Sequence, residues 1–141
     1  MKKTPNNERQ RDARPYWRQV LDLDAMRRIP FWMLAFLTTL VAYRAPYGRR
    51  PAEFDFDISW ASIEWSLYKP LHIIMCAALM VLGVLAYKWK RWWLAALLTM
   101  LVGLSWEIAQ MTVPGHNPRL ADLAPDFLGV VLGWFIVEGI R

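Results

Sequence analysis

The sequence predicts an all-α integral membrane protein with four transmembrane helices and an N-terminal interfacial amphipathic helix. Two observations carry this prediction. Of the 141 residues, 56% are hydrophobic, which is a high share for a soluble domain of this length. Four apolar runs also follow one another along the chain, and a membrane span needs about 20 mainly apolar residues. No large soluble domain is expected between them.

The charge pattern points to lipid rather than to nucleic acid. The formal net charge is +5, and the chain contains nine tryptophans. The basic residues lie beside the apolar runs, where anionic headgroups and membrane topology explain them. We therefore expect membrane lipids as partners and no nucleic acid. The single cysteine, Cys76, lies within an apolar run; it excludes an internal disulfide and is interpreted as a small core residue.

The N-terminal part is expected to lie outside the membrane. Residues 1–14 are charged and lack large apolar side chains, so they should not fold by themselves. In residues 16–28, Trp17, Val20 and Leu21 share one helical face, which is typical of an amphipathic helix at a membrane surface. A solvated linker is the alternative. The predicted organisation is a cytoplasmic basic tail with amphipathic helix over 1–28, and a four-helix transmembrane domain over 29–141.

The first apolar run, residues 30–43, is short for a span unless Arg44 extends to the headgroups. Pro30 suits the first turn of this helix, because the N–H that it lacks is not needed there. The connector over 48–69 begins with apolar residues that alternate with polar ones, which is strand-like. A lone strand at a membrane surface is not stable, so we expect an irregular segment leading into an interfacial helix. The alternating residues are Phe54, Phe56, Ile58 and Trp60.

The remaining spans are predicted over residues 70–87, 92–113 and 122–140, with a tight basic turn over 88–91. Asp122 is expected to cap the last helix, and Pro125 fits its first turn. Of the 17 Lys and Arg residues, 12 fall on the side of the two termini and five on the other. The positive-inside rule then predicts that both termini are cytoplasmic.

The polar residues of the last two spans form a spaced motif. Glu107 and Gln110 share one helical face, and a Pro-Gly turn follows. The next span places polar and small residues on one face, since they recur at intervals of three and four. These residues are Asp122, Asp126, Gly129 and Gly133.

The pattern E-x-x-Q, P-G, D-x-x-x-D-x-x-G-x-x-x-G resembles the signature of the VanZ-like family of small bacterial membrane proteins. The segment Lys69-Pro70-Leu71-His72 is similar to the D-K-x-x-H motif of that family, with Tyr68 in place of the Asp. His116 stands where an Arg usually follows the Pro-Gly, and Asp126 stands where Asn is usual. The resemblance covers about Tyr68 to Gly133. It implies a bacterial cytoplasmic membrane protein and, because the family is associated with glycopeptide resistance, a role at the cell envelope.

Under the predicted topology, polar residues from three spans gather near the outer face. Ionisable groups within a membrane are costly and usually face a protein interior or a polar cavity. The predicted cluster consists of Lys69, His72, Glu107, Gln110, His116, Arg119, Asp122 and Asp126. Gly129 and Gly133 are predicted to let helices pack closely within the bundle.

Three interpretations of this cluster remain open. It could be a structural latch in which Glu107 and Gln110 accept hydrogen bonds from the N-terminal N–H groups of the last helix. It could bind or act on an envelope lipid, with His72 and Glu107 as general base and acid, although no Ser-His or Cys-His arrangement is visible. It could also hold a metal ion or a pigment, although no ligand spacing supports this.

The latch is favoured, so no catalytic residue, metal ligand or cofactor is assigned. The predicted function is therefore non-catalytic: a structural or accessory subunit of a larger membrane complex, for example a respiratory or photosynthetic one, with other membrane protein subunits as partners. A polar motif that departs from its family pattern suits a structural subunit. The alternative is an envelope-lipid-acting or glycopeptide-resistance-type membrane protein.

Overall fold

The structure is a computed structural model that describes residues 23–44 and 52–141. Within this part of the chain the regular structure is helical, and there is no strand. The α-helices are α3 (Leu23–Ala42), α4 (Trp60–Leu67), α5 (Pro70–Tyr87), α6 (Trp92–Gln110) and α7 (Leu123–Ile140), and two short 3-10 helices are η1 (Trp89–Arg91) and η2 (Leu120–Asp122).

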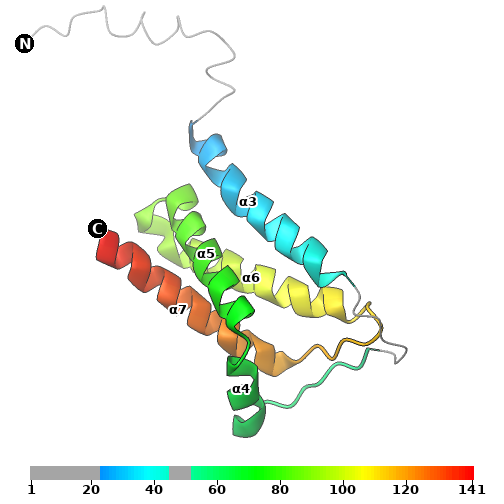
Figure 1. Cartoon of the computed structure of the whole chain (residues 1–141). Coiled ribbons are helices and arrows are strands. Elements are labelled where there is room, and N and C mark those ends of the chain that lie inside the picture. Colours follow the sequence, from blue (N-terminus) through cyan, green and yellow to red (C-terminus); the bar gives the residue numbers. More distant parts are fainter. Residues whose placement is uncertain (1–22, 45–51) are drawn as a thin grey trace, which may run out of the picture.

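Four segments are long and apolar enough to cross a membrane, which confirms the predicted fold class. They lie along one another as a bundle, and α4 lies at one end of it (Figure 1). Their outward side chains are apolar and exposed, as a lipid-facing surface requires; Phe36, Leu97 and Phe135 are examples. The four segments are Ala25–Ala42, Pro70–Tyr87, Trp89–Gln110 and Leu120–Ile140.

The beginning of the first span differs from the prediction. Residues 23–28 belong to α3 itself, and Pro30 lies inside this helix instead of in its first turn. Within a membrane the backbone must bond internally, so continuing the helix through a proline costs less than exposing a broken end. The rest of the predicted amphipathic helix, residues 16–22, lies outside the described residues.

α5 is the central helix, because its packing against α3, α6 and α7 is the most extensive in the bundle. Side chains from these helices fill a core that includes Phe31, Leu79 and Trp106. The α5–α6 turn contains Lys88 at a φ of 69°, a conformation that non-glycine residues seldom adopt. Arg141, after the end of α7, lies over the Trp89 ring at 5.1 Å, so α7 ends beside this turn.

The connector forms one isolated contact instead of a sheet. Asp55 pairs with Arg119 in a single parallel bridge. The N–H of Asp55 donates to the carbonyl of Pro118 at 2.9 Å, and the N–H of Leu120 donates to the carbonyl of Asp55 at 2.9 Å. The strand-like alternation therefore produces one bridge, and the chain then turns into α4, in agreement with the predicted irregular segment and helix.

α4 has an inverted burial pattern. Its buried residues are two serines, Ser62 and Ser66. Trp60, Trp65 and Tyr68 point outward, with 76%, 67% and 77% of their surface exposed. A short helix with polar side chains inward and aromatic ones outward suits an apolar or interfacial environment rather than bulk water.

Two helix ends also differ from the predictions. α6 ends at Gln110 and not at Val113, because the residue before a proline, here Pro114, disfavours the helical region. Asp122 precedes α7 but is itself in the helical region, and its side chain makes no capping bond. The predicted cap was therefore wrong, because this carboxylate is used in an ion pair. Pro125 lies in the first turn of α7, as predicted.

Candidate functional site

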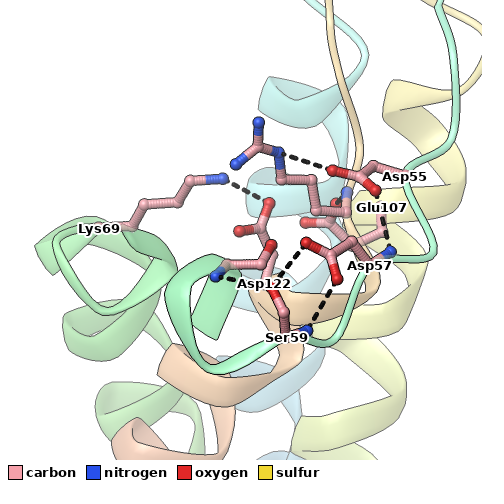
Figure 2. Close-up of polar contacts among 8 residues, drawn as sticks. Asp55, Asp57, Ser59, Lys69, Glu107 and Asp122 are labelled. Carbon is pink, nitrogen blue, oxygen red and sulfur yellow. Dashed lines mark hydrogen bonds and ion pairs between the residues drawn. The ribbon is translucent and has the colours of Figure 1, made fainter. Parts of the chain in front are cut away.

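The first turns of α5 and α7 lie side by side and bring basic and acidic side chains together. Lys69, just before α5, forms an ion pair with Asp122, just before α7 (Figure 2). Three to four residues further along both helices, His72 Nδ1 lies 2.9 Å from Asp126 Oδ1. Both aspartates are fully buried. The two pairs are separated by about one helical turn on both helices, so together they fix the register of α5 against α7.

Glu107 reaches the same region from α6. Its side chain is only 1% exposed, and its Oε2 accepts a hydrogen bond from the main-chain N–H of Arg119 at 3.0 Å. The predicted donors were the N–H groups at the start of the last helix. The observed donor comes from the loop that leads into η2, so Glu107 holds this loop and not the helix end.

The loop that leads into η2 also contacts a polar network on the connector, outside the spans (Figure 2). The Arg119 Nε lies 3.4 Å from Asp55 Oδ2. Asp57 accepts hydrogen bonds from the Ser59 N–H and hydroxyl, both at 2.8 Å, and these bonds lower the pKa of its carboxyl from the ordinary value of 3.8. The sequence interpretation missed Asp55 and Asp57; the alternating pattern around them was the available signal.

An apolar cavity of about 390 Å³ lies between α3, α5 and α6, near the same end of the bundle. Several of its lining residues are more than half exposed, including Leu37, Val41 and Leu71, so the cavity opens on the outer surface of the bundle. Its polar lining comes from His72, Gln110, His116 and Thr38, whose hydroxyl donates to main-chain oxygens of α3. The apolar part includes Leu34, Ala42, Met75 and Trp106.

His72 belongs to both features. Its ring bonds Asp126 on one side, and it also lines the cavity, where the Trp106 ring packs edge-on against it at a centroid distance of 5.5 Å. Trp106 was not predicted as part of the site. The spacing of Trp106 and Gln110, which places them on one face, could have indicated it.

The eight predicted residues therefore divide into two groups. Gln110 and His116 line the cavity, and His116 Nε2 lies 3.4 Å from the main-chain oxygen of Arg44. The other six meet in what we call the polar cluster: Lys69, His72, Glu107, Arg119, Asp122 and Asp126.

The two predicted packing glycines lie in close contact between α7 and α5. A Cβ added to Gly129 would lie 2.7 Å from the Cβ of Cys76, and one added to Gly133 would lie 2.6 Å from the carbonyl oxygen of Ala77. Real Cβ atoms do not approach other heavy atoms this closely. The G-x-x-x-G pattern therefore serves packing within the bundle.

The chemistry available to this end of the bundle is limited. In residues 23–44 and 52–141, no three His, Cys, Asp or Glu side chains are grouped so that they could hold one metal ion. The polar partners of the two histidines are the Asp126 carboxylate and the main-chain oxygen of Arg44, so neither histidine is paired with a serine or cysteine. The arrangement can orient polar groups, hold charge and bind an apolar ligand.

Comparison with known proteins gives one match. A family model described as VanZ/LLP1 matches residues 14–141, which is most of the chain and more than the segment that carried the resemblance. A search of curated proteins and a search of solved structures found no match.

Proposed function

The chain belongs to the VanZ/LLP1 family of membrane proteins, and we propose that it is a non-catalytic protein that binds a membrane lipid. The cavity between α3, α5 and α6 would receive one acyl chain. The observation that carries this proposal is the combination of apolar walls, a surface opening and polar side chains in one cavity.

The dimensions of the cavity support a lipid chain. Its volume of about 390 Å³ lies within the usual range of roughly 300–1,000 Å³ for small-molecule sites. The wall residues on α3 extend from Leu34 to Ala42, which is roughly 12 Å along a helix. Since the exposed lining residues Leu37, Val41 and Leu71 are apolar, an acyl chain already in the membrane could reach the cavity without crossing water.

The polar residues support a specific orientation of that lipid. Gln110 is the last residue of α6 and His72 lies in the first turn of α5, so both lie at the end of the cavity nearest the headgroups. Gln110 has two N–H donors, and each histidine has a second ring nitrogen besides the one that already has a partner. Ester or phosphate oxygens of a lipid would be suitable acceptors there, with the acyl chain extending toward Leu34.

The binding test compares two substitutions of matched exposure. Leu37 lines the cavity and Leu97 does not, and their side chains are 52% and 50% exposed. Each variant is extracted under mild conditions from nanodiscs that contain phosphatidylethanolamine. The number of lipid molecules that stay bound to it is then determined by native mass spectrometry. Leu37→Trp should lose one bound lipid that the wild type and Leu97→Trp retain. Equal retention in the two variants would show that the cavity does not bind the lipid.

We also propose the bacterial cytoplasmic membrane as the location, with both termini in the cytoplasm. The support is the split of basic residues, 12 against five. Single cysteines at Asn117 and Lys90, introduced into a Cys76→Ala background, can be labelled with a membrane-impermeant maleimide in intact cells. Labelling at Asn117 alone is expected. Labelling at Lys90 alone would reverse the orientation and place the polar cluster at the cytoplasmic face.

An accessory-subunit role is a second candidate, and the surface of α4 favours it. Trp60, Trp65 and Tyr68 present exposed aromatic area outside the four spanning helices, where a neighbouring subunit could pack. The test is purification of the wild type and of a Trp60→Ser/Trp65→Ser variant in a mild detergent. A large stable assembly that only the wild type forms would support this role. A monomer with bound lipid in both cases would leave lipid binding as the function.

A further inference from the structure

The polar cluster contains more buried acceptors than it has partners. Glu107, Asp122 and Asp126 are at most 1% exposed. Each uses one carboxylate oxygen in the contacts described above, and each leaves the other buried without a hydrogen-bond partner: Glu107 Oε1, Asp122 Oδ1 and Asp126 Oδ2. Such buried unpaired oxygens are rare in folded proteins and require an explanation.

The charges of the cluster do not balance either. Titratable or charged groups come from every element that packs here: Lys69 and His72 at the start of α5 and Cys76 beside Asp126, Glu107 on α6, Arg119 before η2, Asp122 at its end, Asp126 on α7, Asp55 on the connector, and the exposed Glu64 on α4. Arg119 pairs with Asp55, which leaves Lys69 and His72 to face three buried carboxylates, and His72 is a cation only when it is protonated. Even with His72 protonated, one negative charge lacks a cation.

Glu107 is the carboxylate that lacks a cation. Asp122 and Asp126 each contact a cation or a potential cation, whereas Glu107 contacts only a main-chain N–H. A carboxylate that is buried without a counter-charge binds a proton instead of remaining ionised. A carboxylic acid would also turn one buried acceptor into an O–H donor, and an unpaired carboxylate oxygen of the same cluster could accept from it.

We propose that the polar cluster is a proton-binding site, in which Glu107 takes up one proton from water and holds it in the folded protein at neutral pH. The cluster is then electrically neutral: two cations face two aspartates, and a neutral Glu107 accepts the Arg119 N–H. This proposal does not depend on lipid in the cavity, because it rests on the buried groups alone.

Infrared spectroscopy of the full-length protein in a detergent without ester groups tests the proposal, because lipid ester carbonyls absorb in the same region as a protonated carboxyl group. A protonated carboxyl group gives a C=O stretching band above the amide region, and this band shifts on ¹³C labelling of the carboxyl carbon. Of the described glutamates, Glu53, Glu64 and Glu138 are exposed and Glu107 is buried. The wild type at neutral pH should show the band, and ¹³C-glutamate should shift it, whereas ¹³C-aspartate should not.

Two variants complete the assignment. Glu107→Gln, which keeps the shape of the side chain, should abolish the band, and Glu64→Gln, at an exposed site on α4, should leave it unchanged. Absence of the band at neutral pH in the wild type would overturn the proposal. A band that shifts only with ¹³C-aspartate, or that persists in Glu107→Gln, would also overturn it. The labelling experiment uses wild-type protein and so does not depend on whether a variant folds.

Discussion

The contact between α5 and α7 is made in two different ways along its length. At its first turns, His72 and Lys69 meet Asp126 and Asp122 through ion pairs. One to two turns further, Gly129 and Gly133 bring the α7 backbone directly against α5. Lipid provides no hydrophobic force that pushes helices together, so a membrane bundle depends on such polar contacts and on close packing.

The two stretches differ in how well they tolerate a change in the position or size of a neighbouring group. A long charged side chain such as Lys69 can change its conformation when a neighbour moves. The Lys69 side chain is 35% exposed, so the polar cluster is accessible to solvent at this residue. The glycine stretch has no such freedom, because backbone faces backbone. We therefore expect the glycine stretch to determine whether the helices pack at all, and the polar stretch to determine their register and charge.

The largest effect is expected from a side chain placed in the glycine stretch. Gly133→Leu would force atoms into the carbonyl of Ala77 and the side chain of Met80, which already lie at 2.6 and 2.7 Å from an added Cβ. Overpacking costs about 1–3 kcal/mol and sometimes more. Thermal unfolding in detergent should show a large loss of stability or no folded protein. Gly139→Leu is the matched control, since nothing lies within 4 Å of its added Cβ, and comparable losses in both variants would contradict the close-packing account.

A smaller effect is expected from the polar stretch. Glu107→Leu removes the acceptor of the Arg119 N–H and should cost about 1–3 kcal/mol of stability. Glu107→Gln keeps an acceptor oxygen and the shape of the side chain, so it should cost clearly less in the same unfolding measurement. If the Gln variant were as unstable as the Leu variant, the charge of Glu107 and not its hydrogen bond would hold the loop.

Glu107→Gln also distinguishes a structural role of Glu107 from a catalytic one. A catalytic acid or base cannot be replaced by an amide, because an amide does not exchange the proton. If this variant folds normally and retains its lipid but loses a cellular phenotype, such as glycopeptide tolerance, the non-catalytic proposal would be wrong. We expect folding, lipid retention and phenotype to be preserved together.

The smallest effect is expected at Asp57, which lies outside both stretches. Its folded-state pKa is lowered by the Ser59 N–H and hydroxyl, so its contribution to stability is present above the ordinary value of 3.8 and is lost as the pH falls through the lower folded value. Hydrogen exchange of the α4 amides, corrected for intrinsic pH dependence, should quicken below pH 3.8 in the wild type. Asp57→Asn should exchange at the faster rate at every pH. An unchanged α4 in that variant would show that these bonds do not hold the helix.

Several features could be predicted because they depend on local pattern. The second span was predicted over residues 70–87, and α5 covers these residues. The face that carries Asp122, Asp126, Gly129 and Gly133 was deduced from spacing, and the structure buries all four. The prediction of the first span was less accurate. The local preference of Pro30 suggested that the helix begins there, but the helix continues through this residue.

The sequence by itself determined the membrane class, the number of spans and which residues share a face, because these follow from composition and from a repeat of 3.6 residues per turn. Only the tertiary structure decided what each face meets. Glu107 and Gln110 share a face, yet one binds the Arg119 N–H and the other lines a cavity that α3 completes. Asp55, distant in sequence, joins Arg119 because the connector folds back along the loop before η2. Helical periodicity fixes the direction of a side chain but not its partner, since the partner comes from another element whose position depends on the packing of the whole bundle.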